Sequence, residues 1–124
     1  MSKILLTGST GFIGSSLLKE LSKKNKVYIT LRYPYKRFSF NTKNIYKIKF
    51  KNYDNLNTKL KKLRIDTIIH CATHYVKDHT SKDIKKFADS NILFGNIILE
   101  NLEKMKVKKF INFSTVWEDN YKVN

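Results

Sequence analysis

The amino-acid sequence predicts an α/β fold in which a doubly wound parallel sheet of about five strands carries helices on both faces. Two observations predict this fold. Short apolar runs alternate with longer segments whose apolar residues recur at helical spacing. Three glycines, spaced three apart, lie between the first apolar run and the first amphipathic segment. Alternating strands and helices form parallel sheets with right-handed crossovers, so one doubly wound domain accounts for the whole chain, residues 1–124.

The first half of the chain contains three predicted strands. Residues 3–7 form a buried strand, residues 12–23 an amphipathic helix and residues 26–32 a second strand, which together make a βαβ unit. The next segment holds the only proline and several turn-forming residues, so we expect a loop or a short helix there. A third strand follows at 45–50.

The second half continues the alternation. Asp54 caps a helix that runs through residue 63, and residues 66–72 form a fourth strand. Ser81 caps a long amphipathic helix that ends near residue 104, and a fifth strand follows at 108–114. The predicted buried stripe of the long helix consists of Ile84, Phe87, Ala88, Asn91, Gly95, Ile98 and Leu102.

The length and composition are those of one globular domain from a reducing compartment. The chain has 124 residues, of which 41% are hydrophobic and 13% aromatic. It contains no apolar run of the roughly 18 residues that a membrane span needs, and the run after Lys3 is too short for a signal peptide. The single cysteine, Cys71, cannot form an internal disulfide. We therefore expect a cytoplasmic protein with no membrane partner.

The net charge of +15 invites a nucleic-acid-binding function, but the kind and placement of the cations argue against it. Lysine supplies 22 of the 25 cationic side chains, whereas arginine, whose fork reads bases and phosphates, is scarce. The lysines are also scattered through the predicted helices and strands instead of forming one stripe. We expect no nucleic-acid partner.

The segment "KILLTGSTGFIGSSLLKEL" has the arrangement of a dinucleotide-binding turn, in which a pyrophosphate lies at a helix N-terminus. Gly8 allows the sharp turn after the strand, Gly11 lets the backbone approach a phosphate, and Gly14 lets the helix pack close to the sheet. The spacing G-x-x-G-x-x-G differs from the ordinary G-x-G-x-x-G fingerprint and from the phosphate-binding P-loop. A structural corner without a ligand is the alternative.

The segment "TGSTGFIG" resembles the cofactor turn of the extended short-chain dehydrogenases/reductases, the epimerase/dehydratase group that acts largely on nucleotide-activated sugars. The segment "IIHCAT" at 68–73 is similar to the family's "hLAA" segment, and Asn91 and Gly95 are similar to its "N-x-x-G-x-x-x-L" helix. The segment "FINFSTVW" at 110–117 is similar to its fifth strand. The resemblance implies a Rossmann-type sheet with strand order 3-2-1-4-5 and a nucleotide sugar as the small-molecule substrate.

The resemblance also implies a set of cofactor-binding residues. They lie in the glycine turn and directly after the fourth strand: Gly8, Thr10, Gly11, Phe12, Ile13, Gly14, Cys71, Ala72 and Thr73. After the third strand the family usually places an Asp that reads the adenine amine. Asn52 stands at that position here, which makes the adenine contact a departure from the family pattern.

The residue at the end of the second strand discriminates NADP from NAD. An acidic residue there accepts hydrogen bonds from the adenosine ribose of NAD, whereas a basic residue meets the 2′-phosphate of NADP. Arg32 occupies this position, 18 residues after Gly14, and Lys36 and Arg37 can join it in a phosphate clamp. The sequence favours NADP over NAD as the cofactor, with a surface cation in a lysine-rich chain as the alternative for Arg32.

The resemblance implies hydride transfer between a nicotinamide and a sugar carbon, with a Tyr as acid/base, a Lys that lowers its pKa and a Ser or Thr that holds the substrate oxygen. Thr115 matches that Ser/Thr, and Ser114 is the second choice; two hydroxyls that cap a strand end are the alternative. The family's Y-x-x-x-K does not occur in the sequence. We expect a cofactor-binding part that is truncated before the Y-x-x-x-K helix and the substrate domain, and that is inactive by itself.

A catalytically empty dinucleotide-binding or regulatory module, or the remnant of a degraded gene, is the alternative function. A parent gene that continues with Y-x-x-x-K and a sugar domain favours the enzyme, whereas a native stop codon after Asn124 favours the alternative.

Two further expectations concern metals and self-association. His70, Cys71, His74 and His79 lie within ten residues, but their spacing matches no zinc pattern, so we expect no metal site.

The predicted strand at 108–114 is an exposed sheet edge, and the apolar stripe of the preceding helix lacks a neighbour to pack against. We expect self-association through one of these surfaces, as a homodimer.

Overall fold

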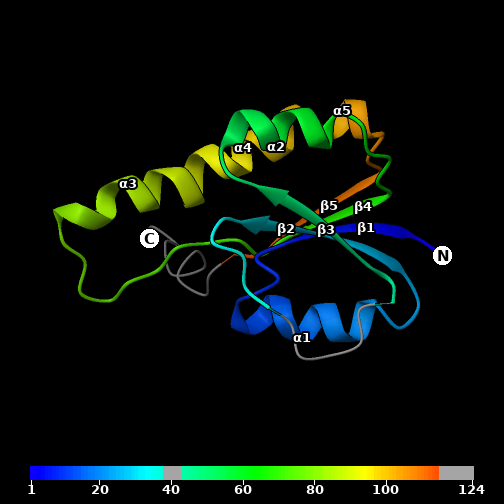
Figure 1. Ribbon diagram of the computed structural model, residues 1–124, viewed down its shortest axis with the longest axis horizontal. Helices are drawn as coiled ribbons and strands as arrows, with labels where there is room; N and C mark the ends of the chain where they lie inside the picture. The colour runs from blue at the N-terminus through cyan, green and yellow to red at the C-terminus, as the bar shows by residue number, and fades with distance from the viewer. Residues whose placement is uncertain (38–42, 115–124) are drawn as a thin grey trace, which may run out of the picture.

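The computed structural model describes residues 1–37 and 43–114, which form one parallel sheet with helices on both faces (Figure 1). The five strands lie in the order β3-β2-β1-β4-β5, which confirms the predicted order. Each pair of neighbours is parallel, so all the strands end at the same edge of the sheet. The strands are β1 (Lys3–Thr7), β2 (Lys26–Arg32), β3 (Ile45–Phe50), β4 (Thr67–His70) and β5 (Lys109–Asn112).

Among the described helices, α1 (Phe12–Leu21) lies on one side of the sheet and the rest lie on the opposite side (Figure 1). On that opposite side, in chain order, are α2 (Tyr53–Leu60), η1 (Ser81–Asp83), α3 (Ile84–Phe87), η2 (Ala88–Leu93), α4 (Phe94–Glu100) and α5 (Leu102–Met105). Helices on both faces of a parallel sheet confirm the doubly wound architecture.

Two helix caps differ from the sequence-based prediction. Asn52, rather than Asp54, caps α2, because its backbone is extended and its Oδ1 accepts a hydrogen bond at 2.8 Å from the N–H three residues on. Thr80, rather than Ser81, caps η1 and forms a capping box with Asp83. In both cases the neighbouring polar residue already lies inside the helix.

The sheet divides the hydrophobic core into two halves, and successive residues of β1 alternate between them because neighbouring strand side chains point to opposite faces. Under α2, α4 and α5 lie Leu5, Ile48, Phe50, Leu56, Leu60, Ile65, Ile68, Phe94, Ile98 and Met105. Under α1 lie Ile4, Leu6, Leu18, Val27, Ile29, Leu31, Ile45 and Ile69. Burying each large aliphatic side chain stabilises the fold by about 1.5–3 kcal/mol.

The helix predicted over 81–104 is present, but its hydrogen-bond pattern changes along its length. It begins with the 3₁₀ turn η1, passes through the π-helical η2 with a right-handed helical backbone on both sides, and is interrupted at Asn101, whose φ and ψ are −99° and 1°. Its apolar stripe is buried at Ile98, whereas Ile84 is 62% exposed. The prediction of one continuous buried stripe is therefore wrong for the first half, which projects beyond the described strands of the sheet (Figure 1).

Strand β5 forms one edge of the sheet, with apolar side chains that are only partly covered. Ile111 is in register with Ile69 and so faces the α1 side, where it is 40% exposed; Phe113 is 44% exposed. The exposed edge that the sequence predicts is thus present, and self-association itself stays a prediction. No helix within the described ranges is long and apolar enough to cross a membrane.

Thr7 joins the ends of β1 and β4 with three hydrogen bonds. Its buried Oγ1 accepts from the N–H of Cys71 and from the N–H of Ala72, both at 3.2 Å. Since these two bonds occupy the lone pairs of the hydroxyl, Oγ1 donates its own proton to Nδ1 of His70, 2.7 Å away. His70 is therefore neutral, with its ring proton on Nε2.

The buried position of His70 predicts a pH-dependent stability. Burial lowers the pKa of His70 below its ordinary 6.5, so the unfolded chain binds a proton that the folded chain does not. The free energy of unfolding should be highest above pH 6.5 and should fall as the pH drops from there through the lowered pKa. Urea unfolding between pH 7 and pH 5 measures this loss.

The matched variants are His70→Asn, whose Oδ1 keeps an acceptor for Thr7, and His79→Asn, which removes an exposed histidine. We expect the loss of stability between pH 7 and pH 5 to shrink in His70→Asn and to persist in His79→Asn. An unchanged pH dependence in His70→Asn would contradict the assignment.

Candidate functional site

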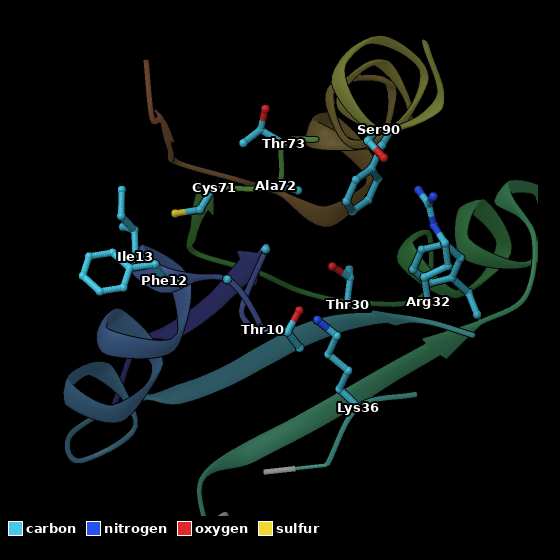
Figure 2. A pocket seen from close by; sticks show the side chains of 15 residues that line it. Thr10, Phe12, Ile13, Thr30, Arg32, Lys36, Cys71, Ala72, Thr73 and Ser90 are labelled. Atoms are coloured by element: carbon cyan, nitrogen blue, oxygen red, sulfur yellow. The ribbon is translucent and has the colours of Figure 1, made fainter. Parts of the chain in front are cut away.

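A cavity of about 520 Å³ lies at the carboxyl ends of β1, β2 and β4, where ligands of open α/β sheets bind. Figure 2 shows Phe12 and Ile13 at one end of it and Arg32 at the other, with Lys36 extending into it from below. The lining residues are Gly8, Thr10, Gly11, Phe12, Ile13, Gly14, Thr30, Arg32, Lys36, Phe50, Cys71, Ala72, Thr73, Ser90 and Phe94. Among these described residues two are cationic and none is acidic.

Two of the three glycines are required by the fold itself. Gly8 has a φ of 69°, and a Cβ there would lie 2.7 Å from the backbone nitrogen of Ala72. A Cβ on Gly14 would lie 2.0 Å from the carbonyl oxygen of Gly8. The backbone of α1 therefore packs directly on the turn after β1, and the turn packs directly on the segment after β4.

Gly11 differs from the other two, because its surroundings do not exclude a side chain. Its backbone is extended, with φ and ψ of −82° and 177°, and an added Cβ would meet only the oxygen of Gly8 at 3.4 Å. Gly11 is the N-cap of α1 and provides no side-chain hydrogen bond to the first turn. The N–H groups at the start of an α-helix lack intrahelical partners, and here they belong to residues that line the cavity, Phe12, Ile13 and Gly14.

The three glycines should therefore respond differently to the same substitution. Gly14→Ala should lower the free energy of unfolding by more than about 2 kcal/mol, because backbone atoms cannot move away from the new Cβ. Gly11→Ala should cost about 1 kcal/mol or less, the cost of a poorer helix cap. Urea unfolding of both variants measures the difference, and equal losses would contradict this reading of the turn.

Arg32, at the end of β2, is held at the far end of the cavity from the glycine turn (Figure 2). Its Nη2 donates a hydrogen bond to the hydroxyl of Tyr53, the first residue of α2. Its guanidinium carbon also lies 5.1 Å from the ring centroid of Tyr53 and 6.0 Å from that of Phe50, which adds cation–π attraction. Lys36 is the second cation of the cavity, whereas Arg37, the third member of the predicted clamp, does not line it.

The segment after β4 forms the wall opposite Lys36, and Asn91 of η2 holds it in place (Figure 2). Oδ1 of Asn91 accepts from the N–H of His74 at 2.7 Å and lies 3.2 Å from the hydroxyl of Thr73, while Nδ2 donates to the carbonyl of His74 at 3.0 Å. Burial raises the pKa of the Cys71 thiol, so this cavity residue stays protonated at neutral pH and is a poor nucleophile.

The sequence match of Asn91 and Gly95 to an N-x-x-G pattern is wrong by one residue, because the two are four positions apart. The structure accommodates the additional residue in the π-helical η2, where hydrogen bonds run from residue i to i+5 instead of i+4. With this turn, Asn91 still reaches the segment after β4, and Gly95 still faces His70, whose Nε2 would lie 3.6 Å from an added Cβ.

Two predicted site residues within the described ranges, Asn52 and Ser114, do not line the cavity. The side chain of Asn52 caps α2, and its adenine contact stays a prediction. Ser114 is exposed and lies just beyond the carboxyl end of β5. The residue before it, Phe113, is still bonded to the neighbouring strand, because its N–H donates to the carbonyl of His70 at 3.0 Å. Thr115 lies outside the described residues.

Four lining residues were not predicted from the sequence: Thr30, Phe50, Ser90 and Phe94. Thr30 could have been found from its alternation with Arg32 on β2, since residues two apart on a strand share a face. Ser90 and Phe94 reach the cavity from η2 and from the start of α4. The one signal in the sequence is the additional residue between Asn91 and Gly95, which the π-helical turn accommodates.

The cluster of histidines divides between different partners. His70 bonds to Thr7, while His74 and His79 pack on the ring of Phe87 with centroids 5.1 and 5.5 Å away. Within residues 1–37 and 43–114, no three His, Cys, Asp or Glu side chains gather in a way that could hold a metal ion.

The fold and the glycine turn define a Rossmann-type domain of the class that binds dinucleotides at a helix N-terminus. Residues 4–119 match the NAD dependent epimerase/dehydratase family. The chain belongs to this family.

Curated relatives share about a third of their residues with the chain. A dTDP-D-glucose 4,6-dehydratase of Dictyostelium discoideum is 35% identical, over 93% of this chain and 29% of the relative. A CDP-abequose synthase of Yersinia pseudotuberculosis is also 35% identical, over 94% of this chain and 40% of the relative. The chain thus spans well under half the length of these relatives.

Solved structures share the fold. The Bordetella bronchiseptica enzyme WbmH in complex with NAD⁺ has a TM-score of 0.76 at 24% identity, over 94% of this chain and 39% of that protein. A UDP-glucose 4-epimerase from Bifidobacterium longum in complex with NAD⁺ and UDP has a TM-score of 0.75 at 21% identity, over 93% of this chain and 37% of that protein.

Proposed function

We propose that this chain is the cofactor-binding part of an enzyme that modifies a nucleotide-activated sugar, and that its cofactor is NADP in preference to NAD. The observation that carries the proposal is Gly11, an exposed glycine that the fold does not require, at the mouth of a cavity where the first N–H groups of α1 lie. A glycine that the fold does not need is explained by a ligand that approaches the backbone. A pyrophosphate at a helix N-terminus is such a ligand.

The residues of the cavity divide the work of holding a dinucleotide. The N–H groups of Phe12, Ile13 and Gly14 supply donors for the pyrophosphate, and the positive end of the α1 dipole attracts its charge. The bound cofactor would supply hydride transfer at its nicotinamide ring. Asn91 would support cofactor binding without touching the cofactor, because it holds Thr73 and His74 against η2 and so keeps the wall of the cavity in place.

The preference for NADP is supported by the charge of the cavity. Arg32 stands where an acidic residue would bind the ribose hydroxyls of NAD, and Lys36 adds a second positive charge. A 2′-phosphate carries charge that these two cations stabilise, and an arginine fork offers it paired hydrogen bonds. An NAD-specific site would instead repel that phosphate with a carboxylate.

We also propose a nucleotide sugar as the substrate and a homodimer as the assembly. The nucleotide-sugar substrate is supported by the names of the relatives, which act on or make dTDP- and CDP-linked sugars. Ser114, at the carboxyl end of β5, and Thr115 remain the proposed positions for a hydroxyl that holds the substrate oxygen. A homodimer is supported by the exposed residues Ile111 and Phe113, and sedimentation that finds only monomer would contradict it.

Calorimetric titration with NADP and NAD at moderate salt tests the proposed function. We expect NADP to bind more tightly than NAD, and Gly11→Val to abolish binding of both because its side chain fills the approach to the helix N-terminus. Arg32→Gln should weaken NADP binding by about 10- to 100-fold, the value of hydrogen bonds to a charged group, and should leave NAD binding unchanged.

Arg64→Gln is the matched control. It also removes one positive charge, but Arg64 precedes β4 and so lies at the amino ends of the strands, away from the cavity. Equal losses in the two arginine variants would show that bulk charge, rather than a site, attracts the ligand. Binding of neither dinucleotide to the wild-type chain would overturn the proposed function.

A further inference from the structure

We infer that Tyr53 is a positioning residue for cofactor selection: its hydroxyl holds the Arg32 guanidinium at the cavity and ties it to η2. The inference rests on the proposed function, since the group that Arg32 would meet is the 2′-phosphate of NADP. It assigns a role to a residue that does not itself line the cavity.

The hydrogen bonds at the Tyr53 hydroxyl have a fixed direction. Its oxygen accepts from Nη2 of Arg32, and its proton is donated to the carbonyl oxygen of Asp89, 3.0 Å away. A phenol has one proton, so donation to a carbonyl leaves its lone pairs free to face the guanidinium. Burial raises the pKa of Tyr53, which keeps the hydroxyl protonated and the donation to Asp89 intact at neutral pH.

The acceptor of this relay is a carbonyl of the π-helical turn. The oxygen of Asp89 also receives the N–H of Phe94 in the i to i+5 bond of η2. The next residue along the turn, Ser90, lines the cavity beside Phe94. Tyr53 therefore joins the end of β2, the start of α2 and the turn that forms the upper wall of the cavity.

Aromatic packing prevents the Tyr53 ring from turning away. Its centroid lies 6.0 Å from that of Phe50 and 6.2 Å from that of Phe94, and both of those phenylalanines are buried. A ring held on two sides presents its hydroxyl in one place. An exposed arginine otherwise samples many rotamers, and holding it in advance reduces the entropy that ligand binding must remove.

The tether leaves Arg32 able to bind a ligand. Nη2 is the one guanidinium nitrogen that donates to a described residue, so the remaining N–H groups can face a phosphate. The cation–π contact with Tyr53 also fixes the plane of the guanidinium, 5.1 Å from the ring. A fixed plane favours the paired hydrogen bonds that arginine makes to phosphate oxygens.

The test is a double-mutant cycle with Tyr53→Phe, Arg32→Gln and the two combined, with NADP and NAD as ligands. Tyr53→Phe keeps the ring and its packing but removes the hydroxyl. We expect it to weaken NADP binding about fivefold, the loss of a modest positioning effect, with NAD binding unchanged. In the Arg32→Gln background, the same substitution should change neither affinity, because Tyr53 acts through Arg32.

Tyr46→Phe is the matched control, since it removes a hydroxyl from a tyrosine of β3 that does not line the cavity. Two results would show a purely structural role of Tyr53 and overturn the inference. One is that Tyr53→Phe weakens the binding of NAD and of NADP equally; the other is that it still weakens NADP binding in the Arg32→Gln background. A wild-type preference for NADP that Tyr53→Phe leaves intact would overturn it while the proposed function stands. Binding of neither dinucleotide to the wild type would overturn both.

Discussion

The close approach of Gly14 to the carbonyl of Gly8 is the constraint on which the rest of the site depends. With 2.0 Å between that oxygen and the place where a Cβ would be, α1 can begin only directly above the end of β1. The same turn leaves no room between Gly8 and the backbone of Ala72 after β4. The N-terminus of α1 is therefore fixed over the crevice between β1 and β4, the switch point where open α/β sheets bind ligands.

A second set of contacts shapes the opposite wall. Two residues of the π-helical η2 make these contacts. Asn91 is hydrogen-bonded to the segment after β4, and the carbonyl of Asp89 accepts a hydrogen bond from Tyr53, so one turn supports the two ends of the cavity wall. π-turns cost hydrogen-bond geometry relative to an α-helix and occur frequently at functional sites. In this chain the π-turn links Arg32, which would select the cofactor, to the hydrophobic core. The link runs through the Tyr53 hydroxyl to the carbonyl of Asp89, and the helix that continues from the turn packs on the core through Ile98.

The strands were predictable because apolar runs bounded by turn residues have few alternative structures, and β1, β2 and β3 begin and end where the runs do. The helix caps were not, because Asn52 and Asp54 are both good caps and the backbone angles decide between them. The glycine turn and Arg32 could be placed from spacing alone. The contact of Arg32 with Tyr53 could not, since it joins residues 21 positions apart and depends on where α2 begins.

Backbone amide NMR of the ¹⁵N-labelled chain during titration with NADP observes the N–H groups that are proposed to hold the pyrophosphate. We expect the largest shifts at Phe12, Ile13 and Gly14, which line the cavity. Unchanged signals of these three amides, with the largest shifts instead around Asn96 and Asn112, would contradict the pyrophosphate site, because those two residues line a separate hollow of about 360 Å³ between α4 and β5.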